Sequence, residues 1–211
     1  MEAYKTLRPG TRVCAELQDR RSRFIAEIAH VSSEEEAAAH LAGLRSAHHA
    51  ARHHVPAWIL ADGTERASDD GEPQRTSGMP TLEVLRGYGL RDISCVTVRY
   101  FGGVLLGPGG LVRAYAGAAR AAIEQAESEQ MIIEMCPVAP VALTLEYADH
   151  ARVLDLVERL GGKVVRTDYS DKVQAHLHFH AGHEQAFLMA LREALAGNEQ
   201  AQVEPVCFTE F

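Results

Sequence analysis

The fold is organised around one stretch, residues 93–115, which reads ISCVTVRYFGGVLLGPGGLVRAY. Residues 93–100 are rich in β-branched side chains, which is typical of a buried strand. Residues 111–127 are rich in alanine and predict a helix. Between them, residues 102–110 contain five glycines, so this backbone can turn sharply and approach a ligand closely. The stretch therefore predicts a strand, a glycine loop and a helix in direct succession.

The residues before this stretch predict further mixed α/β structure. Alternating apolar residues on either side of a polar turn favour a hairpin. A run of residues that follows two serines suited to an N-cap favours a helix. The polar composition after the next strand predicts a long loop, and a proline opens a short helix after it. The expected elements are a hairpin of residues 12–17 and 22–31, a helix at 34–48, a strand at 55–60, a loop at 61–79 and a helix at 80–87.

The residues after the alanine-rich helix predict the order β-α-β-β-α-β, which is that of a ferredoxin-like sheet with two helices on one face. The alternation in residues 173–180 places His176, His178 and His180 together on the open face of that sheet, where we expect them to be solvated. The expected elements are strands at 137–147, 163–169, 173–180 and 202–208, a helix from Asp149, and a second helix ending at Gly197-Asn198.

A boundary between two domains is expected near residues 128–140, where the segment Cys136 to Pro140 contains two prolines and should break any regular element. The sequence thus predicts an α+β protein of two domains. Residues 1–133 would form a two-layer α/β domain, and residues 134–211 a ferredoxin-like βαββαβ domain.

Composition narrows the class of protein. The chain has 211 residues, of which 46% are hydrophobic and 24% charged, so a packed core is expected and disorder is excluded as the main state. No apolar run is long enough to span a membrane, and residues 1–10 lack a signal peptide's apolar stretch, so we expect a cytoplasmic protein without a membrane partner. The four cysteines are far apart, and we expect neither a metal site nor a cofactor.

Charge gives a mixed indication. The net charge of −8 argues against general affinity for polyanions. However, only three of the 21 basic residues are lysines, and arginine is the residue suited to bidentate contacts with phosphate or carboxylate.

Three segments stand out as candidates for chemistry. One is Arg52-His53-His54, directly before a strand, although a lone histidine is more often structural than catalytic. The other two are an acidic run and the glycine loop. The acidic run Asp69-Asp70-Gly71-Glu72-Pro73 lies in a polar loop, and its carboxylates need a cation, a nearby arginine or full exposure to water. The glycine loop is bracketed by Arg99 and Arg113, whose guanidinium groups suit an anion. It matches neither G-x-G-x-x-G nor a Walker P-loop, so nucleotide hydrolysis of the P-loop kind is disfavoured. Both segments also have plain interpretations: a solvated acidic turn, and a turn whose glycines permit close helix–strand packing.

Together these motifs resemble those of the IMPACT family, in particular its bacterial two-domain YigZ type. The resemblance rests on RFIA at 23–26, ARHH at 51–54, DDGEP at 69–73 with Thr76 and Gly78, RYFGG at 99–103 and LGPGGLVRAY at 106–115. It implies an N-terminal domain similar to a ribosomal small-subunit protein's second domain, and a C-terminal domain similar to a late domain of a translocating elongation factor. It also suggests nucleic-acid or ribosome binding, without a settled activity.

The chain departs from the family pattern at two places that concern charge. Gln74 and Arg75 stand where small residues usually precede the threonine, and Leu105 replaces the loop's common lysine. Arg75 would supply the positive charge that Leu105 lacks.

Three hypotheses about function follow. The first is a translation-associated regulator that binds RNA or ribosomes, and its expected phosphate ligands are Arg75, Arg99, Arg113 and the loop glycines Gly102, Gly103, Gly107, Gly109 and Gly110. The second is an enzyme acting on a phosphorylated or nucleotide-like ligand in a cleft with His53, Asp70 and Glu72 as candidate acid–base groups, none of them assigned as catalytic. The third is an interaction scaffold whose motifs only stabilise the fold. Whether the chain is an enzyme, and whether it forms homo-oligomers, is left open at this stage.

Overall fold

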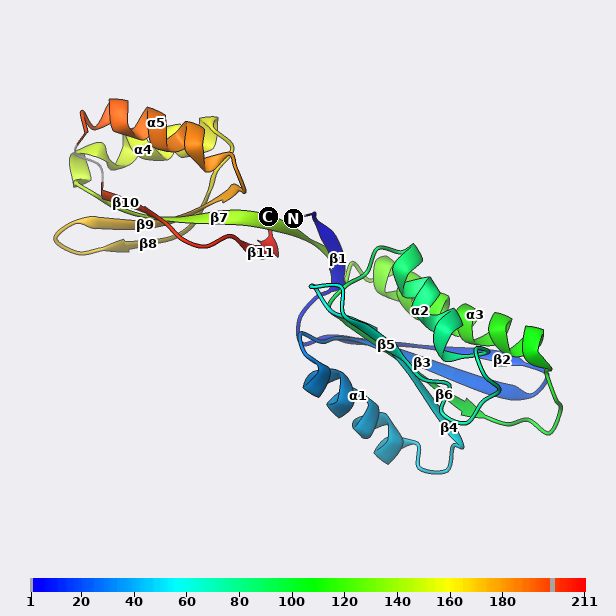
Figure 1. Cartoon of the computed structure of the whole chain (residues 1–211). Helices are drawn as coiled ribbons and strands as arrows, with labels where there is room; N and C mark the ends of the chain where they lie inside the picture. Colours follow the sequence, from blue (N-terminus) through cyan, green and yellow to red (C-terminus); the bar gives the residue numbers. More distant parts are fainter. Residues whose placement is uncertain (1, 198–199) are drawn as a thin grey trace. The chain divides into compact units, whose positions relative to one another are not determined.

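A computed structural model describes residues 2–197 and 200–211 of the chain (Figure 1). Over these residues it is an α+β protein with two sheets and five helices. The chain divides into two compact units: Tyr4–Ile133 forms the first, and Glu134–Phe211 forms the second together with the residues before Tyr4. Each unit has its own apolar core.

The first unit is built on an antiparallel sheet in the order β2-β3-β6-β4-β5. Its strands are β2 (Arg12–Asp19), β3 (Ser22–His30), β6 (Ile93–Tyr100), β4 (His53–Ile59) and β5 (Glu65–Ala67). The sequence did not predict β5, which lies inside the expected loop at 61–79, nor β1 (Tyr4–Leu7), which bridges to Leu90 through Lys5. These strands are only three and four residues long, too short for a periodic pattern to appear.

Helices cover both faces of this sheet, so the expected two-layer arrangement is wrong and the unit has three layers (Figure 1). Helix α1 (Glu34–Ala47) packs through Leu44 on one face, against Val96 and Val98. Helices α2 (Gly78–Gly87) and α3 (Pro108–Ser128) pack on the opposite face. The physical reason lies in β6, which is buried without interruption from Ile93 to Arg99, because a central strand with two covered faces has no solvent side.

The second unit follows the predicted β-α-β-β-α-β order. Its elements are β7 (Ile132–Leu145), α4 (Tyr147–Arg159), β8 (Lys163–Tyr169), β9 (Val173–His180), α5 (Glu184–Ala194), β10 (Gln200–Val203) and β11 (Cys207–Glu210). The strands run β8-β9-β7, and both β10 and β11 pair with β7. The expected last strand at 202–208 is therefore two strands. The predicted end of the second helix includes Asn198, which lies outside the described residues.

The predicted faces of this sheet are confirmed. Ala175, Leu177 and Phe179 are buried with residues of α4 and α5. The three histidines that alternate with them are partly exposed.

The segment Cys136 to Pro140 does not break regular structure, contrary to expectation, because β7 runs through it. Proline's fixed φ is compatible with a strand, and only its N–H donor is lost. The two proline carbonyls still accept hydrogen bonds, Pro137 O from Ala181 N and Pro140 O from Glu204 N. Both prolines therefore fit within a paired strand.

Candidate functional site

The candidate residues gather at one end of the first sheet. The strand register places the first residues of β3 and β4 beside the last residues of β6, with His53 opposite Arg99 and Arg23 opposite Tyr100. The glycine loop, the start of α3 and the acidic segment lie at the same end. We call residues 19–22, 48–53, 68–77 and 99–113 the loop end.

Asp69 organises the acidic segment. Its carboxylate accepts hydrogen bonds from the backbone N–H groups of Arg75, Ser77 and Gly78 at 2.7, 3.1 and 2.9 Å, and from Ser77 Oγ at 2.7 Å. Partial burial acts to raise the pKa of Asp69, but these hydrogen bonds to the charged form outweigh it and lower the pKa below its usual value. Asp69 therefore shapes the turn that leads into α2.

Asp70 connects this segment to β4 and α1. Its carboxylate accepts from Arg45 Nη2 and from the backbone N–H of His54, both at 2.7 Å. Its carbonyl oxygen lies 2.8 Å from His53 Nδ1. Since a carbonyl can only accept, Nδ1 carries a proton, and in the neutral imidazole Nε2 keeps its lone pair. That Nε2 lies 3.8 Å from Glu72 Oε1, which is the proximity that the enzyme hypothesis requires.

Glu72 and Arg99 form a buried ion pair. Arg99 Nη1 donates to both carboxylate oxygens, at 2.6 and 2.9 Å, and the two side chains are 3% and 6% exposed. Tyr115 Oη donates to Glu72 Oε1 at 2.8 Å. Burial and the adjacent Glu72 raise the pKa of Tyr115, which holds its hydroxyl in the donating form. The expected role of Arg99 as a free phosphate ligand is thus not what this geometry provides, because its charge is balanced by Glu72.

Sequence reasoning did not select Tyr115 as part of the site. The available signal was a tyrosine on the alanine-rich, buried side of α3, where a phenol hydroxyl needs a hydrogen-bond partner.

Two aromatic rings enclose the Arg99 guanidinium. Its Cζ lies 5.4 Å from the centroid of the Phe24 ring and 5.6 Å from that of Phe101. Phe24 is fully buried, whereas Phe101 is 50% exposed. The Nε atom of Arg99 is buried, and no hydrogen-bond partner for it is found within residues 2–197 and 200–211. Arg99 therefore contacts one aromatic ring in the core and one at the surface.

The loop glycines have different physical requirements. A Cβ on Gly102 would lie 2.0 Å from the carbonyl carbon of Arg21, so the β2–β3 turn leaves no room for a side chain. Gly103 and Gly107 have φ of +85° and +71°, in the region that favours glycine. Gly107 is the N-cap of α3 and provides no side-chain cap, and Gly109 and Gly110 form the first turn of that helix. The loop thus has both packing and conformational reasons for its glycines.

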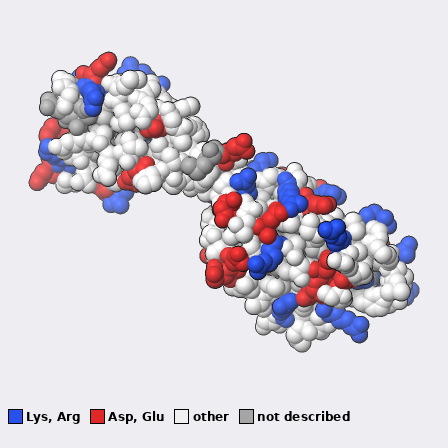
Figure 2. Space-filling view, in the orientation of Figure 1, with Lys and Arg blue, Asp and Glu red and all other residues white. Residues whose placement is uncertain are grey.

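Five exposed arginines lie in the segments of the loop end. Among the described residues no ion-pair partner is found for Arg20, Arg21, Arg52, Arg75 or Arg113. Of the carboxylates at this end, those of Asp69, Asp70 and Glu72 are engaged as described above. Figure 2 shows blue side chains along the edge of the first unit at this end, at the lower right of the view. The loop end is therefore a locally basic surface on an acidic chain.

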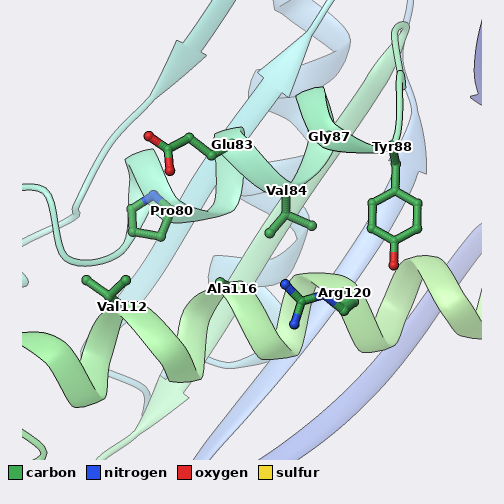
Figure 3. A pocket seen from close by; sticks show the side chains of 8 residues that line it. All are labelled: Pro80, Glu83, Val84, Gly87, Tyr88, Val112, Ala116 and Arg120. Carbon is green, nitrogen blue, oxygen red and sulfur yellow. The ribbon is translucent and has the colours of Figure 1, made fainter.

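An apolar groove lies elsewhere in the first unit, between α2 and α3 (Figure 3). It has a volume of about 410 Å³, with Val84 and Ala116 on its floor and Glu83 and Arg120 at its margins. None of the residues predicted for a site lines it.

Residues 2–197 and 200–211 contain neither a cluster of metal ligands nor a helix that could span a membrane. No group of three or more His, Cys, Asp or Glu side chains is arranged to hold a metal ion. None of the helices there has the length and apolar character needed to cross a membrane.

Known proteins share this architecture. The Impact N-terminal domain model matches residues 20–123, and a domain of unknown function (DUF1949) matches residues 143–198. An Escherichia coli protein described as IMPACT family member YigZ is 37% identical over 173 residues, covering 80% of this chain and 82% of that protein. A Haemophilus influenzae IMPACT family member is 43% identical over 125 residues, covering 57% and 61%.

A solved structure is similar over nearly the full length. It is a crystal structure of a hypothetical protein, with a TM-score of 0.61 and 32% identity over 97% of this chain and 98% of that chain. The sequence relatives, the two matched domains and the two-unit fold agree. This chain belongs to the IMPACT family and has the two-domain organisation of its YigZ-like members.

Proposed function

We propose that the protein binds the phosphate backbone of RNA through the loop end, in the cytoplasm and in the context of translation. The observation that carries the proposal is the group of exposed arginines in the loop end, for which the described part of the chain provides no ion-pair partner. Phosphate contacts from arginine supply most of the affinity in nucleic-acid binding and require local, not global, positive charge. Beyond about 10 Å, salt screens the acidic residues elsewhere on the chain.

The likeness of the two domains to parts of the translation machinery supports this context. The family resemblance implies that the first unit is similar to a domain of a ribosomal small-subunit protein, and the second to a domain of a translocating elongation factor. Such a likeness of fold is an analogy, so the arginines carry the proposal.

The proposal predicts salt-sensitive binding that depends on these arginines. For the variant Arg52→Gln/Arg113→Gln, we expect affinity for single-stranded RNA to fall about 10- to 30-fold at 0.1 M salt, and the dependence of log K on log salt to become shallower by about 1.4, because two phosphate contacts are lost. Fluorescence anisotropy over a salt series measures both quantities, and co-sedimentation shows whether ribosomes bind equally.

The matched control is Arg120→Gln. Arg120 is also exposed on α3, but it lies about 10 Å further along the helix than Arg113. Binding that is absent at low salt, or reduced equally by the control, would contradict the proposal.

A second candidate function is supported by the geometry of His53. Its fixed Nδ1–H leaves Nε2 as a proton acceptor beside Glu72, which suits general-base chemistry on a small phosphorylated ligand. We expect such a ligand to raise the melting temperature of the wild type and to do so less for His53→Phe, which removes both ring nitrogens. A thermal-shift screen of nucleotides and sugar phosphates tests this, and equal shifts in the two proteins would reject His53 as a contact.

A further inference from the structure

We propose that Phe101 is a stacking platform for an unpaired RNA base. The inference rests on the proposed function, since it specifies which chemical form of RNA the loop end receives. It follows from three features of one side chain: its exposure, what supports it from beneath, and what surrounds it.

Phe101 is one of the six phenylalanines of the chain. It is half exposed, although phenylalanine is usually buried. One face of its ring lies over the Arg99 guanidinium. Half of the residue is exposed, so the ring can meet a flat partner. A nucleobase is such a partner, and base–aromatic stacking accepts any base because each has a π face.

The ring is also held in place. Arg99 next to it is fixed by both oxygens of Glu72 and contacts the buried Phe24 ring. A ligand that stacks on Phe101 thus meets a prearranged surface, which reduces the entropy lost on binding. A mobile exposed phenylalanine would not have this advantage.

The surroundings favour nucleic acid over an apolar protein partner. Unpaired arginines lie on neighbouring segments, including Arg21, whose backbone is packed against Gly102. An aromatic ring among phosphate-binding cations is the arrangement with which proteins hold single strands. Paired RNA keeps its bases stacked inside the duplex, so the platform selects unpaired nucleotides.

Trp58 is the single tryptophan of the chain and is buried in a separate cluster on the α1 face of the sheet, which allows a direct test. In a Trp58→Phe background, Phe101→Trp places the fluorophore on the platform. We expect single-stranded oligo(A) to quench this fluorescence, while an RNA duplex of equal length quenches it less. Absence of quenching at saturating oligo(A) would overturn the inference.

Affinities measured by anisotropy separate stacking from phosphate contacts. We expect Phe101→Ala to weaken oligo(A) binding about tenfold and Phe101→Tyr to restore it, whereas binding of an abasic oligonucleotide is unchanged. Leu105→Ala is the matched control, because Leu105 is an apolar residue of the same loop and is 81% exposed. This variant should have no effect on binding.

If oligo(A) binding depends on the arginines but not on Phe101, the stacking inference fails and the proposed function stands. If Leu105→Ala weakens binding as much as Phe101→Ala, a general apolar contact replaces the platform. If the wild type binds no RNA, both proposals fail.

Discussion

Replacing Glu72 by alanine is expected to lower the free energy of unfolding by about 3–5 kcal/mol, because it leaves the Arg99 charge buried without a counter-charge. It also removes the acceptor of Tyr115 Oη, which is buried as well. Chemical denaturation followed by circular dichroism measures the loss. A decrease below about 1 kcal/mol would show that water or a rearranged side chain compensates the charge.

Two further variants test the cause. Glu65→Ala breaks the Glu65–Arg86 ion pair, whose side chains are 33% and 45% exposed, and should cost no more than about 1 kcal/mol. The double variant Glu72→Leu/Arg99→Met removes both buried charges and should recover part of the stability lost in Glu72→Ala. If Glu72→Leu/Arg99→Met is less stable than Glu72→Ala, burial of an unpaired charge is not the main cause of the lost stability.

Substituting Gly102 by valine is the second change with a large expected effect, about 3 kcal/mol or more of unfolding free energy. The new Cβ would lie 2.0 Å from the Arg21 carbonyl carbon and 2.4 Å from Ser22 N, so backbone, not a flexible side chain, must move. The Gly102 N–H to Ser22 Oγ hydrogen bond, at 3.2 Å, would be disturbed with it. Thermal unfolding of the purified variant measures the effect.

The adjacent glycine separates packing from conformation. A Cβ on Gly103 would meet no atom within 4 Å, but its φ of +85° disfavours a side chain. Gly103→Ala should therefore cost only about 1–2 kcal/mol. Equal losses at Gly102 and Gly103 would mean that loop conformation, and not contact with the β2–β3 turn, explains the requirement for glycine.

The sequence predicted the long elements of both units because their apolar periodicity records which side is buried. It missed the third layer of the first unit, since residues 93–98 look like a buried strand whether one or two layers of helices cover the sheet. It also misjudged residues 136–140, because the effect of a proline depends on whether its missing donor is needed, and that is decided by the partner strands.

The candidate site was predicted as a set of residues, and the roles within it were not. Arg99 and Glu72 are 27 positions apart. They meet because the segment that contains Glu72 is tied through Asp70 to the start of β4, and the register of β4 and β6 places that start opposite Arg99. A sequence motif indicates that a cation and several carboxylates belong to one site. It does not show which of them neutralise one another. The arginines that remain unpaired became recognisable only after these partners were known.

The hydrogen bonds of Asp69 have a consequence for how the protein would meet a ligand. The residues after it, up to Gly78, carry no regular structure before α2, yet one carboxylate holds three of their backbone N–H groups. The backbone of these residues is therefore already ordered in the folded protein, and ligand binding need not order it. We expect encounter at this surface to proceed without a slow conformational step, so that observed association rates should rise linearly with ligand concentration.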